Sequence, residues 1–218
     1  MSATPVQTAI ARGAEALGVP LGPDAPERLA QLIDALLHWN RRINLVAPTT
    51  ALEAVERHVL DSLAVLRLLD RPEVQALGSA WWDIGSGSGF PALPLAIARP
   101  DLELRLVEPN GKKVAWLQDA RARFGLAGVT VQQARLDALS GTGPAAAMSR
   151  ATFAPEQWAQ LAEPLVGPEG RILVMMGHGA PDEVTSRAWR LDRFELPESG
   201  ATRVNAILRA SLDPAVPS

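Results

Sequence analysis

The residues with the clearest chemistry lie in one glycine-rich run. Asp83-Ile84-Gly85-Ser86-Gly87-Ser88-Gly89-Phe90-Pro91 follows the short apolar segment 80–84. Glycines let the chain turn tightly and let a ligand approach the backbone where a side chain would clash. A plain turn between a strand and a helix has a similar composition, so the run alone leaves both interpretations open. The ligand interpretation predicts contacts at Gly85 and Gly87.

A carboxylate farther along the chain narrows the choice of ligand. Glu108 ends the apolar segment 102–107, 23 residues after Gly85, where a carboxylate can accept hydrogen bonds from both hydroxyls of an adenosine ribose. A dinucleotide needs glycines spaced GxGxxG, with pyrophosphate at a helix N-terminus. Here the third glycine comes one residue too early, and Asp83 directly precedes the loop. This arrangement favours S-adenosylmethionine as cofactor, and an NAD-dependent oxidoreductase is the alternative.

These residues require a scaffold, and the pattern after residue 72 supplies one. Apolar segments typical of strands alternate with segments that have a helical period. The alternation predicts an α/β fold, with a mostly parallel sheet covered by helices on both faces. In such a sheet, ligands bind beyond the carboxyl ends of the strands. The predicted strands are 80–84, 102–107, 129–133, 145–149, 171–176 and 204–209, and the predicted helices are 91–99, 111–124, 155–165 and 182–189.

The first 72 residues have a different pattern, which is helical throughout. One helix is expected over 6–17, and two apolar stripes with the helical period follow it. We therefore predict an N-terminal helical extension over 1–72, a Rossmann-like domain over 73–212 and a short tail over 213–218. The stripes consist of Leu29, Leu32, Ile33, Leu36 and Leu37, and of Leu52, Val55, Val59, Leu63 and Leu66.

Composition excludes several kinds of chemistry. The 218 residues include no cysteine and three scattered histidines, so disulfides, cysteine-ligated metals and thiolate nucleophiles are excluded and no metal site is expected. The net charge of −3 means that any contact with nucleic acid must be local. Neither a membrane-spanning run nor a secretory signal is recognisable. We expect a soluble cytoplasmic protein and a monomer.

Several segments together carry a resemblance to a known family. The sequence resembles the RsmG (GidB) family, bacterial methyltransferases that act on guanine N7 of 16S ribosomal RNA in the small subunit. The resemblance implies a class I methyltransferase fold with an N-terminal helical extension. The matching segments are His38-Trp39-Asn40, Ile43-Asn44-Leu45, Arg57-His58-Val59-Leu60-Asp61-Ser62, the run from Asp83 to Ile97, Gly111-Lys112-Lys113-Val114, Gln133-Ala134-Arg135-Leu136-Asp137 and Ser149-Arg150-Ala151.

By position, the resemblance also implies further cofactor contacts. These fall at Gly85 and Phe90, at Leu136 and Asp137 after the third predicted strand, and at Arg150 after the fourth. Asp137 can accept a hydrogen bond from the adenine amino group while Leu136 flanks the ring, although an aspartate there can also cap a helix. Arg150 can bind the methionine carboxylate or the RNA backbone.

The implied reaction needs little from the protein. Guanine N7 has a free lone pair and no proton, so its attack on the sulfonium methyl requires no general base. Positioning and electrostatics then suffice. Cytosine C5 methylation would need a cysteine, and methylation of an exocyclic amine typically uses an Asn/Asp-Pro-Pro-aromatic motif where Ser149-Arg150-Ala151 stands. We therefore name no catalytic residue.

Candidate RNA contacts occur in two places. On the helix predicted over 111–124, Lys112, Lys113, Trp116 and Arg123 are expected to lie away from the apolar face, where they could hold phosphate and stack a base. A solvated helix face with a partly buried tryptophan is an equally good interpretation. In the helical extension, Arg57-His58 is the second candidate.

The chain departs from the family pattern at three places. Ala145-Ala146-Ala147 stands where members carry an acidic residue, Met176-Gly177 where they carry Lys-Gly, and Arg203 lacks the usual following histidine. A third hypothesis is therefore a non-catalytic ribosome-assembly module on a methyltransferase fold.

Overall fold

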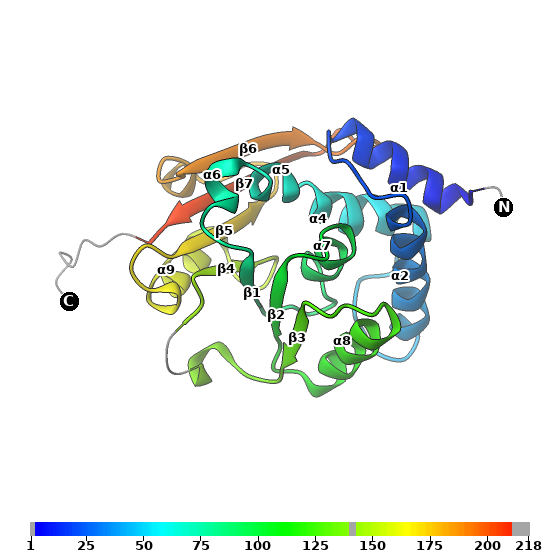
Figure 1. The fold of residues 1–218 in the computed structure, drawn as a ribbon, viewed down its shortest axis with the longest axis horizontal. Helices are drawn as coiled ribbons and strands as arrows, with labels where there is room; N and C mark the ends of the chain where they lie inside the picture. The colour runs from blue at the N-terminus through cyan, green and yellow to red at the C-terminus, as the bar shows by residue number, and fades with distance from the viewer. Residues whose placement is uncertain (1–2, 140–142, 211–218) are drawn as a thin grey trace.

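The protein is built on one seven-stranded sheet, seen in a computed structural model that describes residues 3–139 and 143–210 (Figure 1). The strand order is β3-β2-β1-β4-β5-β7-β6, with β1 to β5 parallel and β7 antiparallel to both of its neighbours. The mostly parallel sheet is thus confirmed. The strands are β1 (Ala80–Ile84), β2 (Glu103–Val107), β3 (Val129–Gln132), β4 (Ala146–Ser149), β5 (Arg171–Met176), β6 (Arg190–Glu195) and β7 (Thr202–Arg209).

Strand β6 was not expected, and the helix predicted over 182–189 is shorter than expected. That helix, α10, covers only Asp182–Thr185, and the Trp189 amide already donates to the Ile207 carbonyl of β7 at 2.9 Å. One inward-facing position of β6 is Asp192, which pairs with Arg67 of the extension at 2.7 Å. A charged residue at a buried position hides the alternation by which a strand is recognised.

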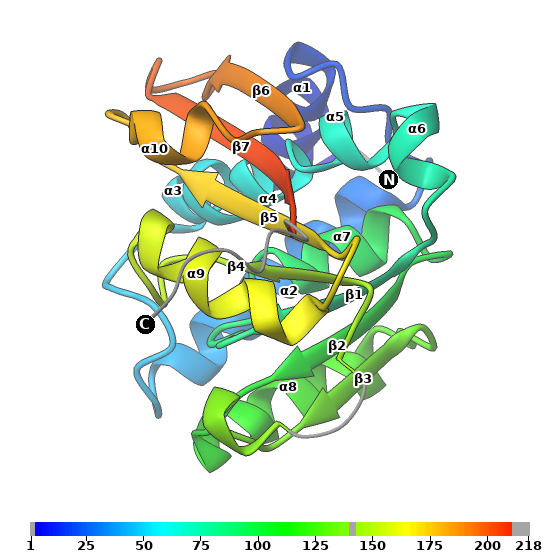
Figure 2. The same ribbon diagram turned by 90° about the vertical axis from the view of Figure 1, so that its left-hand side faces the viewer.

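Helices cover the two faces of the sheet unequally (Figure 2). Helices α7 (Ala92–Ala98) and α8 (Gly111–Arg123) lie on one face, and α9 (Pro155–Val166) packs on the other, against β4 and β5. On the second face, Glu103, Arg105 and Thr130 of β2 and β3 are exposed. Helices thus lie on both faces, as predicted, but this half of the second face is left uncovered, because the β3–β4 connection contains only the short helix η2 (Leu136–Ala138) among its described residues.

The N-terminal part is helical, as predicted, but its second apolar stripe is broken. Capping boxes begin two of the helices: Thr4 with Gln7, and Thr50 with Glu53. Leu52, predicted on the apolar face, is 54% exposed. The elements are α1 (Pro5–Ala16), α2 (Ala25–Asn40), α3 (Ala51–Ala54), the π-helical turn η1 (Val55–Leu60), α4 (Asp61–Leu63), α5 (Leu66–Leu69) and α6 (Pro72–Gln75).

The extension and the sheet share one hydrophobic core. Leu36 of α2 and Leu63 of α4 belong to the same buried cluster as Leu95 of α7 and Leu104 of β2. A second cluster lies under α9, around Trp158. The division at residue 72 stays a prediction, and the predicted tail 213–218 lies outside the described residues.

Candidate cofactor and RNA site

The sheet order brings the predicted cofactor residues to one edge. Strand β1 lies between β2 and β4, so the glycine loop after β1, Glu108 after β2 and Arg150 after β4 meet at the carboxyl ends of neighbouring parallel strands. Strands β2 and β3 are added on one side of β1, and β4 and β5 on the other. The carboxyl end of β1 is therefore the topological switch point, where α/β sheets bind ligands.

The glycine loop has a backbone that glycine alone adopts without strain. Gly85 and Gly87 have φ values of +69° and +56°, in the left-handed region that disfavours other residues. The Gly85 and Ser86 amides both donate to the Val107 carbonyl, at 2.8 and 3.1 Å. A Cβ on Gly85 would lie 2.6 Å from the Thr152 side chain, whereas beside Gly87 the nearest atom would be 3.7 Å away. The loop is therefore closely packed at Gly85 and open at Gly87.

Glu108 holds this loop in place. Its side chain is 5% exposed, and its two carboxylate oxygens accept from the Gly87 amide at 2.8 Å and the Asn110 amide at 2.9 Å. Each carboxylate oxygen can accept more than one hydrogen bond. The geometry thus leaves acceptor capacity for ligand hydroxyls next to the glycine loop.

Asp83 is the strongest feature that sequence reasoning left unassigned. It is 1% exposed at the end of β1, and neither carboxylate oxygen has a hydrogen-bond partner among the described residues. Burial raises the pKa of Asp83 to about 7, with the Glu108 charge acting in the same direction and the neighbouring Ser86 hydroxyl and the Arg150 charge acting against it. A buried carboxylate without a partner is costly, so its presence directly before the glycine loop indicates a cationic ligand group. The sequence signal that could have identified Asp83 as a site residue was its position just before the first glycine of the loop.

Arg150 joins the site to the helical extension. Its guanidinium donates to the Asp61 carboxylate at 3.0 Å and to the Arg57 carbonyl at 3.2 Å, and lies 3.3 Å from His58 Nδ1. The Arg150 Cζ is 5.6 Å from the centre of the Phe90 ring. The sequence motifs around residues 57–62 and 149–151 are thus two halves of one cluster.

The same cluster determines the charge state of His58. Its ring packs 5.2 Å from that of Phe90. Burial, with the Arg150 and Arg57 charges adding to it, lowers the pKa of His58 to about 4. His58 is therefore neutral near pH 7. Arg203 lies 3.3 Å from the other carboxylate oxygen of Asp61. Arg203, which lacks the histidine that usually follows it in the family, therefore belongs to the same cluster.

Two hydroxyls that were not predicted fasten β4 to the glycine loop. Ser149 Oγ donates to the Ile84 carbonyl at 2.8 Å, and Thr152 Oγ1 donates to the Gly85 carbonyl at 3.0 Å. Between them, Ala151 has a φ of +57°, an uncommon conformation for alanine. Strained residues concentrate at functional sites, and this one turns the chain directly after Arg150.

The predicted adenine contacts lie on the turn after β3. Leu136 is half-buried and packs on the second core cluster. Asp137 is exposed and lies 3.3 Å from Arg135 in an ion pair. Nothing in this arrangement tests the predicted adenine contact, which stays a prediction.

The predicted RNA face of α8 is only partly as expected. Lys112 is exposed, but Lys113 is half-buried, and its ammonium lies 4.0 Å from where a Gly87 Cβ would be. Arg123 is exposed at the other end of the helix, about 16 Å from Lys112 at 1.5 Å per residue, and pairs with Asp119 at 3.8 Å.

Neither interpretation of Trp116, as a base-stacking or a partly buried side chain, agrees with the structure. Trp116 is 0% exposed, and its indole nitrogen donates to the Ser88 carbonyl at 3.0 Å. The ring fills the space between α8 and the glycine loop, so it supports the loop. Its neighbour Trp39, at 6.0 Å between ring centres, is half-buried.

Metal and membrane features are absent from the part of the chain that the structure describes. Within residues 3–139 and 143–210, His, Asp and Glu side chains form no group that could hold a metal ion. No helix in those two ranges is long and apolar enough to cross a bilayer.

The fold is the Rossmann-like fold of class I methyltransferases. A solved S-adenosylmethionine-dependent O-methyltransferase from Thermotoga maritima superposes with a TM-score of 0.53 and 16% identity, covering 81% of this chain and 71% of its own. At that identity, the likeness shows the fold.

Sequence similarity identifies the family. The family described as rRNA small subunit methyltransferase G matches residues 25–196. The chain is 40% identical over 210 residues to "Ribosomal RNA small subunit methyltransferase G" of Myxococcus xanthus, covering 91% of this chain and 94% of that protein. The protein of that name from Pseudomonas aeruginosa is 36% identical over 178 residues, 81% of this chain and 80% of its own. The chain belongs to this family of S-adenosylmethionine-dependent enzymes, which rules out the NAD-dependent alternative.

Proposed function

We propose that this protein transfers a methyl group from S-adenosylmethionine to guanine N7 of 16S ribosomal RNA, acting as a monomer on the small ribosomal subunit in the cytoplasm. The observation that carries the proposal is the buried carboxylate of Asp83 near the end of β1, which has no hydrogen-bond partner among the described residues. The methionine moiety of the cofactor carries a cationic ammonium group, which could serve as the missing partner of this carboxylate.

Other predicted cofactor residues are proposed to bind the same ligand. Glu108 has acceptor capacity for the ribose hydroxyls. The open side of Gly87 leaves room for the cofactor against the backbone. Leu136 and Asp137 are proposed for the adenine, as the sequence suggested.

The chain's own groups support a reaction that needs no base. Bound S-adenosylmethionine supplies an activated methyl on a sulfonium. His58 has its pKa held near 4 and faces the Arg150 guanidinium, so it is a weak base in an unsuitable position. Asp83 is 1% exposed and is proposed to pair with the cofactor ammonium, so it is shielded from an RNA base. The residues of the site therefore bind and orient, which suffices for attack by N7.

The RNA-facing surface is proposed to begin at the Arg150 cluster. Arg150 and Arg203 both pair with the carboxylate of Asp61, and the Arg57 charge acts on the neighbouring His58, so this part of an acidic protein is locally positive. RNA phosphate is attracted to such a patch. Lys112 at the start of α8 would extend the same surface, with Lys113 and Arg123 as further candidates.

Single-turnover methyl transfer tests the function. With cofactor held at saturation on small subunits that lack the modification, the product should be N7-methylguanosine, and the rate constant should change little between about pH 6 and pH 8 because no proton is removed. A tenfold rise per pH unit would assign the methyl to another RNA position. Cofactor binding without any methyl transfer would favour the non-catalytic assembly module.

A salt titration tests the RNA surface. Changing Lys112, Lys113 and Arg123 to Ala should lower the salt slope of RNA binding by about 0.7–0.9 for each lost phosphate contact. Cofactor affinity should be unchanged in Lys112→Ala and Arg123→Ala, whereas Lys113 lies beside Gly87 and is measured separately. Arg57→Ala should lower it by a similar step. Arg193→Ala, an exposed position on β6, is the matched control and should leave the slope as it is. Equal slopes for all the variants would remove these residues from the RNA surface.

A further inference from the structure

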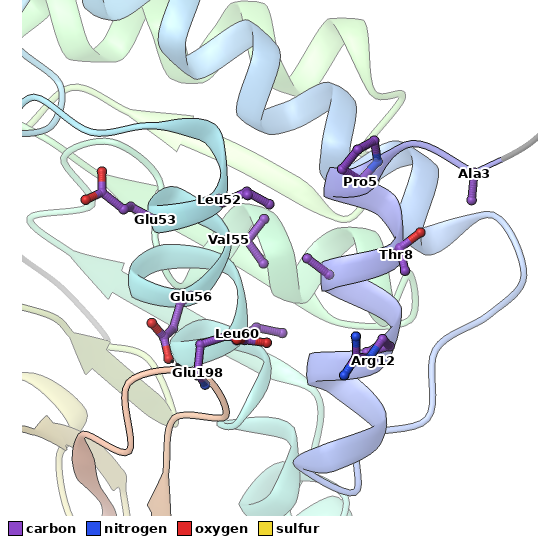
Figure 3. A pocket seen from close by; sticks show the side chains of 11 residues that line it. Ala3, Pro5, Thr8, Arg12, Leu52, Glu53, Val55, Glu56, Leu60 and Glu198 are labelled. Atoms are coloured by element: carbon purple, nitrogen blue, oxygen red, sulfur yellow. Dashed lines mark hydrogen bonds between the residues drawn. The ribbon is translucent and has the colours of Figure 1, made fainter.

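A groove on the far side of the extension is not used by the proposed chemistry. It has a volume of about 630 Å³ and runs between α1 and the helical turns α3 and η1 (Figure 3). Leu52 and Val55 point from α3 and η1 toward α1, and Leu60 lies in the same wall. Leu52 is 54% exposed. An apolar channel between two helices is the type of surface that accepts a third helix.

The charged residues of the groove have a bias. Three of the lining residues, Glu53, Glu56 and Glu198, are acidic and one, Arg12, is basic. Glu56 and Glu198 lie close together at one end of the groove, with the Glu56 carboxylate directed toward the loop of Glu198, whereas Glu53 points outward (Figure 3). The Glu56 carboxylate is held in place because it accepts from the Glu198 and Ser199 amides, at 3.0 and 2.7 Å.

This charge pattern selects among possible occupants. RNA phosphate would meet the carboxylates of Glu56 and Glu198, which disfavours it. A symmetric contact with a second copy would bring the same carboxylates face to face, which costs free energy. A protein segment with an apolar anchor beside Leu52 and a Lys or Arg beside Glu198 satisfies both features.

We propose that this groove docks a basic protein segment with an apolar anchor, displayed by the ribonucleoprotein particle on which the enzyme acts. The inference rests on the proposed function in that it takes the particle as substrate. Turn η1 connects the two sites: Val55, Glu56 and Leu60 line the groove, while Arg57 and His58 contact Arg150. A segment bound in the groove would therefore hold η1, and with it the RNA-facing cluster, against the particle.

The test compares protein-free 16S rRNA with assembled small subunits. The double change Leu52→Ser with Glu198→Lys removes the apolar contact and reverses one charge. It should weaken binding to assembled subunits by about tenfold or more, while affinity for S-adenosylmethionine and for protein-free RNA stays the same. Leu77→Ser, at the other exposed leucine, is the matched control. Arg12→Glu adds a carboxylate to the groove and should tighten binding to subunits.

The outcomes separate the inference from the proposed function. Unchanged binding of the double variant to subunits would overturn the docking site, and equal losses on protein-free RNA would make the groove an RNA contact. A photoreactive residue at position 52 gives a direct readout: ribonuclease-resistant cross-links to a protein support the proposal, and cross-links to RNA refute it. If the unmodified enzyme methylates neither substrate, the proposed function fails, whatever the groove binds.

Discussion

At the scale of single residues, Asp83 makes cofactor binding depend on pH. Its pKa of about 7 in the free protein means that the carboxyl becomes protonated as the pH falls below that value. Only the ionised form pairs with an ammonium, so affinity for S-adenosylmethionine should fall by up to tenfold per pH unit below about pH 7. Calorimetry from about pH 5.5 to 7.5 measures this slope.

The matching control is Asp83→Asn, which should bind the cofactor weakly and without that slope. The stability of the cofactor-free protein depends on pH in the opposite direction to cofactor affinity. Because the folded pKa is raised above the usual value of 3.8, the free protein loses stability as the pH rises from about 4 to 7. Removal of the charge should therefore stabilise the cofactor-free protein near pH 8. An asparagine variant with unchanged cofactor affinity would show that Asp83 does not hold the ammonium.

At the scale of elements, the glycine loop and the turn after β4 act as one unit. Gly85→Ala would place a Cβ 2.6 Å from Thr152 and strain a backbone at φ +69°, so we expect the loop to shift and cofactor binding to fall more than tenfold. Gly87→Ala meets no close protein atom and adds a backbone strain of about 1 kcal/mol, so the cofactor-free fold should lose less stability than with Gly85→Ala. Its methyl group would lie where the cofactor is proposed to approach the backbone, so cofactor binding should also weaken. Thermal unfolding without cofactor distinguishes the two variants, and equal losses of stability would refute the packing argument.

The elements also show what could be predicted from the sequence. The glycine run, Glu108 and the strand–helix alternation identified the sheet edge, because each has a local pattern. Trp116 was misplaced because the helical period does not reveal that the glycine loop lies over that face of α8. Strand β6 was missed because Asp192 is buried through an ion pair with Arg67, a residue 125 positions away in sequence.

At the scale of the whole molecule, the shared core predicts a single unfolding transition. The leucines of α2 and α4 pack in the same cluster as those of α7 and β2, and the Arg150–Asp61 pair also joins the extension to the sheet. Urea unfolding followed by tryptophan fluorescence and by far-ultraviolet circular dichroism should give coincident curves. Two separated transitions would show that residues 1–72 form a unit of their own.

The unpartnered carboxylate of Asp83 has a consequence for the life of the protein in the cell. Without a ligand, it destabilises the fold near neutral pH, and a bound methyl donor relieves that cost in addition to the usual gain from ligand binding. We therefore expect molecules starved of donor to open more often and to be degraded faster. The steady-state amount of this enzyme should follow the donor supply, so that a metabolic shortage reduces the methylating capacity twice, through occupancy and through abundance.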